Sequence, residues 1–341
     1  MTLWQTITDG VKKKSFQQVD AFIHDPSAAA FVPDASYVQL TLADMSLGTA
    51  MLWFQERYPS VTATVSLDFA GATQSFTTVA GPPGDKLGPG VFLNYPLTPL
   101  LPYRGGVVQI TAGLVALKGD NRVKIMLDVL ADFSSLVAPP LGAAVKVASK
   151  LDDGVGRLLD STGVVLGLHN SYVAPGPGAA NGLEGGYYAV VRAADATFDK
   201  AQLSVVDSRL LYGGQPLDGY DYILLHLGSR QERDSWAFPD LQALLDEAKR
   251  RRILEDDNGY DDVRKQLLAA IVTSPDFTDA DRWIIADKVK DQLHRLASLA
   301  DGAVISAEPT LEEALQASRL DLDQAASRPP ITLDSLLTAT P

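Results

Sequence analysis

The chain has 341 residues, of which 29 are basic and 42 acidic, so its formal net charge is −13. Hydrophobic residues make up 46% and charged residues 21%, which is typical of a globular protein with one large domain or two ordinary ones. An acidic balance disfavours broad binding of nucleic-acid phosphates and of anionic lipid, because both need clustered lysine and arginine. We therefore expect neither a nucleic-acid nor a membrane partner.

The composition also excludes several chemistries. Cysteine is absent, which excludes disulfides, zinc–thiolate sites, iron–sulfur clusters and a cysteine nucleophile. The first residues carry no basic segment followed by an apolar one, so no signal peptide is predicted. No window reaches about 18 consecutive apolar residues, so no spanning helix is predicted. These observations favour a cytoplasmic protein.

The charge is unevenly distributed along the chain. Residues 1–150 hold 11 basic and 11 acidic residues, so the whole acidic excess falls in residues 151–341. This asymmetry indicates two differently built regions.

The first predicted element is an N-terminal helix within residues 1–26. Apolar residues recur at helical spacing from Leu3 to Ile23. The dipeptide Asp25-Pro26 then ends the pattern, because a proline cannot continue a helix.

Residues 27–120 predict a β-sandwich-like region. Polar and apolar residues alternate, with many threonines and valines, over residues 37–42, 61–69, 75–79 and 105–117. Prolines and glycines crowd residues 80–104, which we expect to form loops or an edge strand because proline cannot donate to a ladder. This pattern is typical of an antiparallel sandwich.

Residues 121–170 predict a helical hairpin. Two apolar stripes at helical spacing lie on either side of Pro139-Pro140, which would form the turn. A Gly/Pro-rich loop over residues 171–186 follows it.

Residues 187–320 predict an acidic α+β region. Strands are expected at 187–192, 203–206 and 222–227. Helices are expected at 239–248, 263–271 and 278–296, with a last short one opened by Pro309. Residues 321–341 resemble a flexible tail.

The predicted fold class is α+β, with an N-terminal β-sandwich-like region and helical hairpin, then a smaller sheet and a helical C-terminal region.

His226 is the strongest candidate for a catalytic residue. It follows an apolar strand and precedes a polar segment, so it could act as a base with Ser229 as nucleophile, and with Glu232 and Asp234 nearby. Asp221 is five residues away on an extended strand and projects to the opposite face. The segment also lacks the Gly-x-Ser-x-Gly pattern. A mixed-charge loop before the next helix accounts for the same residues, and both interpretations stay open.

Metal and nucleotide motifs fail on their spacing. Aligning Gly259 with the invariant glycine of a calcium loop puts Leu254 and Lys265 at ligand positions, where oxygen ligands are required. The glycines of residues 176–182 miss the dinucleotide fingerprint, and a phosphate-binding Gly-Lys-Ser/Thr is absent from the sequence. We expect no cofactor and no metal. The basic run of residues 249–252 is flanked by acids, which indicates a helix C-terminus rather than a nucleic-acid site.

Two features point to a protein partner. Aromatic residues of the type that dominates interaction hot spots occur at Trp53, Tyr58 and Trp236. Behind a polar Arg-Pro-Pro tether, the C-terminus carries a short apolar patch of the kind that orders on binding, made of Ile331, Leu333, Leu336 and Leu337.

The sequence favours a non-catalytic protein-interaction or assembly component of a cytoplasmic multiprotein complex. This hypothesis depends on missing motifs, and catalytic groups need only meet in space. The alternatives are a hydrolase or transferase with a site around His226, and a cargo or regulatory subunit recruited through its C-terminal tail.

Overall fold

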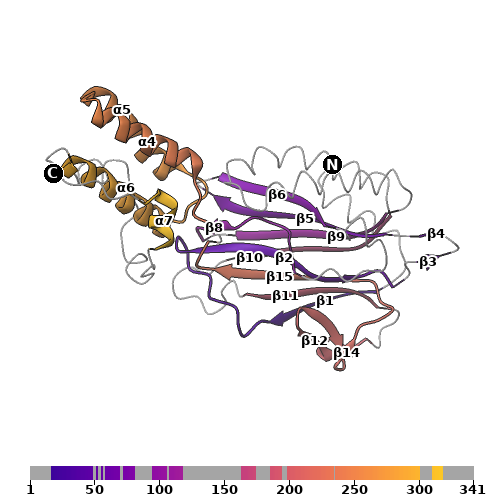
Figure 1. The fold of residues 1–341 in the computed structure, drawn as a ribbon. Coiled ribbons are helices and arrows are strands. Elements are labelled where there is room, and N and C mark those ends of the chain that lie inside the picture. Colours follow the sequence, from indigo (N-terminus) through magenta and orange to yellow (C-terminus); the bar gives the residue numbers. More distant parts are fainter. Residues whose placement is uncertain are drawn as a thin grey trace. The chain divides into compact units, whose positions relative to one another are not determined.

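The computed structural model describes residues 17–48, 51–52, 55–56, 58–69, 72–80, 94–105, 107–117, 163–173, 185–193, 198–233, 235–299 and 309–317. The chain divides into two compact units. The first, which we call the sheet unit, comprises residues 1–31, 37–101 and 105–230. The second, the helical unit, comprises residues 32–36, 102–104 and 231–341. Helices and antiparallel sheets together define the α+β class (Figure 1).

The largest sheet joins strands from distant parts of the chain. Its order is β1 (Gln17–His24), β11 (Gly186–Ala193), β15 (Tyr222–Arg230), β2 (Ser36–Ser46) and β7 (Tyr95–Pro96), and β8 (Leu101–Tyr103) also pairs with β2. The paired registers are antiparallel. The nearly continuous apolar run of β15 suits its central place, because a central strand is covered on both faces.

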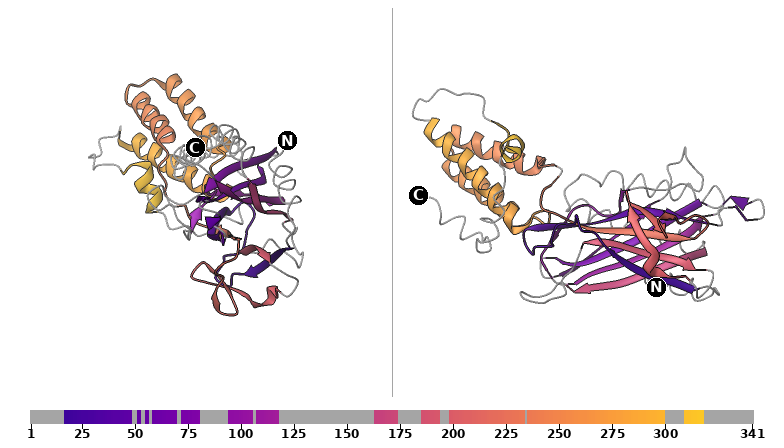
Figure 2. Two further views of the ribbon diagram at one scale, coloured as in Figure 1. Left: turned by 90° about the vertical axis from the view of Figure 1, so that its right-hand side faces the viewer. Right: turned by 90° about the horizontal axis from the view of Figure 1, so that it is seen from below.

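A second large sheet has four antiparallel strands. Its order is β10 (Gly163–Val173), β9 (Val107–Leu117), β5 (Tyr58–Phe69) and β6 (Ala72–Ala80). Strand β9 contacts β15, and β10 contacts β11 (Figure 2). The sheet unit is therefore sandwich-like.

The main core lies between these two sheets. Residues of β9, β2, β11 and β15 supply completely buried apolar side chains, among them Ile110, Leu114, Leu40, Leu42, Val190, Leu225 and Leu227. The pleat turns successive side chains to opposite faces, so the runs of consecutive buried residues in β2, β11 and β15 indicate that both faces of these strands are covered.

The structure also describes two small sheets. The first is built from β12 (Leu203–Val206), β13 (Arg209–Tyr212) and β14 (Gln215–Pro216), and it follows the 3₁₀ turn η1 (Lys200–Gln202). The second pairs β3 (Met51–Leu52) with β4 (Gln55–Glu56). Gly213 and Gly214 join β13 to β14 with φ of 57° and 79°, values that glycine adopts without steric cost.

A β-bulge in β2 directs a carboxylate inward. Leu224 pairs with Asp44 and Leu225 with Leu42, which leaves Ala43 as the extra residue. Asp44 Oδ2 accepts hydrogen bonds from the Tyr222 hydroxyl at 2.7 Å and from the Leu210 amide at 3.1 Å. Within the described part of the chain, the other oxygen, Oδ1, is buried and has no hydrogen-bond partner.

The helical unit contains α4 (Pro239–Ile253), α5 (Asp257–Thr273), α6 (Asp279–Leu299) and α7 (Leu311–Gln316). Its sequence signals match the structure: Pro239 is at the start of α4, and the Thr278 hydroxyl caps α6 by accepting from the Asp281 amide at 3.1 Å. The core is formed by apolar side chains from all four helices and the preceding loop, including Leu245, Leu267, Ile271, Phe277, Ile285, Val289, Leu311 and Leu315.

Two short earlier segments belong to the helical unit through charges and a backbone bond. The Ala280 amide donates to the Asp34 carbonyl at 3.2 Å. Asp279 Oδ1 lies 2.6 Å from the buried Arg282 guanidinium and 3.9 Å from that of Arg104. Burial is the largest influence that lowers the pKa of Arg282 and raises that of the Asp34 carboxyl. These contacts account for residues 32–36 and 102–104 being part of this unit.

Two predictions of helix are wrong where the structure describes them. Residues 17–24 form the strand β1, because pairing with β11 satisfies the hydrogen bonds of their backbone. The alternation of Val19, Ala21 and Ile23 is compatible with a strand, and the apolar residues of this segment also fit helical spacing. Residues 163–170, expected at the end of a helical hairpin, belong to β10 and pair with β9. The remainder of that hairpin, residues 121–162, lies outside the described residues, as do residues 174–184 of the expected loop and the expected tail 321–341.

The division of the chain also differs from the one that the charge asymmetry indicated. The strands within residues 187–230 were expected to form an acidic region together with the helices, but they belong to the sheet unit. Pairing of β15 with β2 and of β11 with β1 joins segments far apart in sequence, which a local charge count does not register. Within the described helices, none is both long and apolar enough to cross a membrane.

Candidate functional site

His226 lies on β15, on the face of the sheet that also carries Tyr187 of β11. The two rings are 4.5 Å apart between centroids. Its Nε2 atom lies 2.9 Å from Oδ2 of Asp25, so Nε2 carries the proton that it donates to the carboxylate. A methyl group at Gly228 would lie 3.1 Å from the imidazole Cε1. The absence of a side chain at Gly228 therefore gives the imidazole ring the space it needs. The ring is therefore held on three sides, with 24% of the side chain exposed.

Asp25 is held by the turn that follows β1. Its Oδ1 atom accepts from the Ser27 amide at 2.9 Å and from the Ser27 hydroxyl at 2.6 Å, which is the geometry of an Asx turn. Burial is the largest single influence on this carboxyl and acts to raise its pKa. The bonds from Ser27 and His226 together outweigh burial, and the pKa of Asp25 is lowered. No sequence pattern predicts this pair, because 201 residues separate its members.

The other catalytic candidates do not gather around His226. The Ser229 hydroxyl donates to the Ala30 carbonyl at 3.0 Å, and three residues along a strand places Ser229 on the opposite face from His226. Asp221 pairs with Arg192 at 3.0 Å instead. Glu232 is exposed, and Asp234 lies outside the described residues. The described geometry therefore contains an Asp–His pair but does not bring the predicted nucleophile to it.

The acidic run at residues 255–262 makes internal contacts. Asp256 caps α5, with its Oδ1 accepting from the Gly259 amide at 3.0 Å. Its other oxygen pairs with Arg251 at 2.6 Å, and Asp257 pairs with Arg252 at 2.9 Å. Across the described residues, no group of three or more histidine, aspartate or glutamate side chains is arranged to hold a metal ion.

The same residues form the end of the α4–α5 hairpin, which we call the hairpin tip and define as residues 247–262. The chain reverses at Leu254 and Glu255, and Glu255 adopts a positive φ of 57°. Basic residues end α4 and acidic residues begin α5, an arrangement that each helix dipole favours. Both helix ends are thereby stabilised by their own charges.

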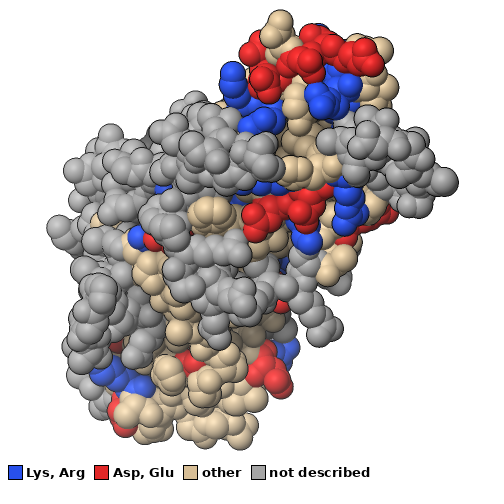
Figure 3. Space-filling view, turned by 90° about the vertical axis from the view of Figure 1, so that its left-hand side faces the viewer, with Lys and Arg blue, Asp and Glu red and all other residues tan. Residues whose placement is uncertain are grey.

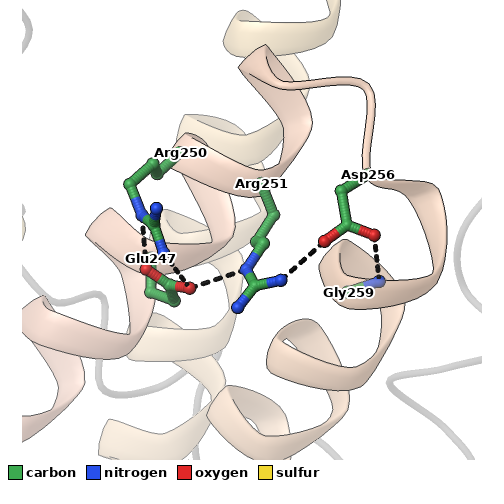
Figure 4. Close-up of polar contacts among 5 residues, drawn as sticks. All are labelled: Glu247, Arg250, Arg251, Asp256 and Gly259. Carbon is green, nitrogen blue, oxygen red and sulfur yellow. Dashed lines mark hydrogen bonds and ion pairs between the residues drawn. The ribbon is translucent and has the colours of Figure 1, made fainter.

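A continuous network of ion pairs crosses the hairpin tip (Figure 4). Glu247 binds Arg250 and Arg251, each at 2.7 Å, and Arg251 reaches across to Asp256. Hydrogen bonds from these two arginines lower the pKa of Glu247 to about 2. Each exposed pair contributes little stability singly, but linked pairs restrict the positions that the side chains adopt. Figure 3 shows such acidic and basic side chains interleaved over the helices.

Two large apolar side chains stand exposed on this tip. Ile253 is 70% exposed and Leu254 is 63% exposed. Elsewhere in the described residues, the exposed large hydrophobic side chains are Phe22 and Val206, which are far from one another in sequence. No sequence pattern predicts that Ile253 and Leu254 are exposed, because their exposure depends on how α4 packs.

The predicted interaction residues meet different outcomes. Trp236 is 9% exposed and belongs to the core of the helical unit, so its burial does not favour the contact role, which stays a prediction. Its ring packs edge-on against Phe238, and the apolar side chains of the helices cover both residues. Tyr58 begins β5, and its side chain is not described. The remaining residues lie outside the described part: Trp53, Ile331, Leu333, Leu336 and Leu337.

Comparison with protein families, with curated protein sequences and with solved structures finds no match for this chain. Its function must therefore be argued from its own residues.

Proposed function

We propose that the chain is a non-catalytic protein-binding component of a cytoplasmic complex, and that the hairpin tip is its contact surface. The observation that carries the proposal is the exposure of the neighbouring side chains Ile253 and Leu254. A single exposed apolar side chain needs no explanation, but two adjacent ones on a protruding turn form a patch that burial would stabilise.

The position of the patch supports a role in binding rather than in folding. Leu241, Leu245 and Ala248 already supply the face of α4 that packs into the helical core. Ile253 and Leu254 follow at the end of the helix and add nothing to that face. Their loss would leave the core of the unit unchanged.

The ion pairs also support this role, because they order the surface before a partner arrives. Arg252 stacks on the Tyr260 ring at 5.5 Å in addition to pairing with Asp257. A surface whose side chains are already fixed loses less conformational entropy on binding, so more of its contact energy remains as affinity. The hairpin tip is therefore preorganised.

The charges favour a protein over a nucleic acid as partner. Arg250, Arg251 and Arg252 each bind a carboxylate of the same tip. A phosphate that approached these arginines would meet the negative field of the carboxylates already bound to them. Cysteine is absent from the sequence, which fits the reducing environment of the cytoplasm.

Site-specific photo-crosslinking tests this proposal. A photoreactive amino acid is placed at Ile253 in the full chain, expressed in its native cells, and a matched one is placed at Val206, which is 53% exposed in the sheet unit. We expect a discrete protein adduct from position 253 and none from position 206. The absence of an adduct at 253, or the same adducts from both positions, would contradict the proposal.

A further inference from the structure

Asp218 and Gly219 form a turn between β14 and β15, and both residues are exposed. Within the described part of the chain, the Asp218 carboxylate makes no hydrogen bond or ion pair, and the Gly219 amide donates no hydrogen bond. Glycine has no side chain to shield its nitrogen. The turn therefore presents an unbound carboxyl group directly before an unbound and accessible amide.

A carboxyl group and an amide in this order can react with each other. The Gly219 nitrogen attacks Cγ of the protonated Asp218 carboxyl, and the new nitrogen–carbon bond closes a succinimide ring. The amide proton leaves with the carboxyl hydroxyl as water. Water then opens the ring. Cleavage of the new bond restores aspartate, whereas cleavage of the original peptide bond leaves isoaspartate, in which the backbone runs through the side-chain carbon.

A second bond of this kind is protected by its surroundings. Asn258-Gly259 is the more reactive bond in an unfolded chain, because the carbon of a neutral amide is more electrophilic than that of a carboxylate. In the structure both residues belong to α5, and the Gly259 amide donates to Asp256 Oδ1 at 3.0 Å. A side chain on a helix also points back toward the helix N-terminus, away from the amide that follows it. Folding therefore hinders this reaction.

We propose that Asp218-Gly219 is a site of spontaneous isoaspartate formation in the folded protein, and that the start of α5 protects Asn258-Gly259. Of the Asp–Gly and Asn–Gly bonds in the sequence, these two are the ones that the structure describes. The reaction at Asp218 needs only water as co-reactant. It does not depend on the proposed contact surface.

The position of the turn gives the modification a structural effect. A methyl group at Gly48 would overlap the Gly219 carbonyl, so the turn lies directly against this glycine. Strand β15 begins at Tyr222, whose hydroxyl donates to the buried Asp44 at 2.7 Å. The extra backbone carbon of isoaspartate displaces either the contact with Gly48 or the start of β15. Isoaspartate formation therefore destabilises the sheet unit.

Incubation of the folded full chain in water enriched in heavy oxygen tests the proposal, because hydrolysis of each succinimide incorporates the label. Trypsin in ordinary water then releases residues 210–230 and 253–264 as separate peptides. Mass spectrometry measures the label in each peptide, and fragmentation locates the isoaspartate. We expect label and isoaspartate at Asp218. A peptide 210–230 that stays unlabelled would overturn the proposal.

The same incubation of the chain unfolded in guanidinium chloride supplies the reference for α5. The ratio of label in 210–230 to label in 253–264 should be at least about tenfold higher for the folded chain, because a hydrogen bond to a charged acceptor must open before Gly259 reacts. Asp256→Ala removes that acceptor and should raise the label in 253–264 of the folded chain about fivefold, the factor that loss of a helix cap implies. An equal ratio in the two states would reject the protective role of α5.

Asp218→Glu provides the specific variant, because it keeps the charge but would have to close a larger ring that forms far less readily. It should remove the label from residues 210–230, whereas the matched control Asp240→Glu, at another exposed position, should leave both peptides as in the wild type. The aged wild type should also unfold at a lower denaturant concentration than the fresh protein, and aged Asp218→Glu should not. Label that persists in 210–230 of Asp218→Glu would show that another residue reacts and would overturn the assignment.

Discussion

The sheet unit and the helical unit use their charged residues in opposite ways. In the sheet unit, Asp44 is buried beneath Tyr222, and Asp25 is tied to His226 with 12% of its side chain exposed. In the hairpin tip, the charged groups lie at the surface and surround Ile253 and Leu254. The first arrangement stabilises one conformation of the chain, and the second presents a prepared surface to solvent.

This difference supports the proposal that the hairpin tip, rather than the surroundings of His226, is the contact surface. His226 resembles a catalytic residue in the sequence, but in the structure its bonds fix the turn after β1 against β15. Charged residues at 249–257 resemble an ordinary solvated helix end in the sequence, but in the structure they frame exposed apolar side chains. A polar cluster should therefore be judged by what its members bind, and not by residue type alone.

The largest expected effect separates two leucines of the helical unit. Leu245 is completely buried and Leu254 is exposed. Leu245→Ala should lower the free energy of unfolding by about 2–5 kcal/mol, because it leaves a cavity in the core. Leu254→Ala should change it by no more than about 0.5 kcal/mol, as is usual for a surface site. Urea denaturation followed by circular dichroism measures both.

The matched chemistry of the two substitutions removes side-chain type as a variable. Equal losses of stability would contradict the distinction between the core and the contact surface in this unit.

The next effect concerns the Asp25–His226 pair. Asp25→Asn removes a hydrogen bond to a charged group and should cost about 1.5–3 kcal/mol near neutral pH. Because the folded-state pKa of Asp25 is lowered, its stabilising contribution is present above the unfolded pKa and is lost as pH falls through the folded value. Urea denaturation at several pH values should show wild type and variant converging in acid. A constant difference at every pH would mean that the carboxylate charge contributes nothing.

The smallest effect has the opposite pH dependence. Burial, the largest influence, raises the pKa of Asp44, so the folded state holds its proton to higher pH than the unfolded chain does. The wild type should therefore lose stability relative to Asp44→Asn as pH rises through the unfolded and then the folded pKa. The same denaturation series measures this difference, and a trend favouring the wild type with rising pH would contradict it.

Patterns within short segments of the sequence predicted several strands and helix starts correctly. Alternation found β5 and β9, and proline and capping residues found the starts of α4 and α6. Strand β1 was predicted as a helix because its apolar residues fit both periods until β11 supplies hydrogen bonds. The choice between the two periods depended on a pairing partner about 170 residues away.

Prediction of the candidate sites was also limited by contacts between residues that are distant in sequence. The catalytic role of His226 stays a prediction, and its hydrogen-bond partner Asp25 could not be predicted because it belongs to a turn that is distant in sequence. Trp236 resembles a contact residue in the sequence and is buried, whereas Ile253 and Leu254 match no sequence pattern of a contact residue and are exposed. Burial depends on the packing of several helices, which residue type and spacing in one sequence do not determine.

Hydrogen–deuterium exchange tests the central claim, that the contact surface is the hairpin tip, most directly. Exchange is compared between the purified, dilute chain and the same chain isolated in complex from its native cells. We predict slower exchange in the complex for the amides of residues 250–262, with unchanged exchange around His226 on β15. Slower exchange at β15 with an unchanged hairpin tip would contradict the claim.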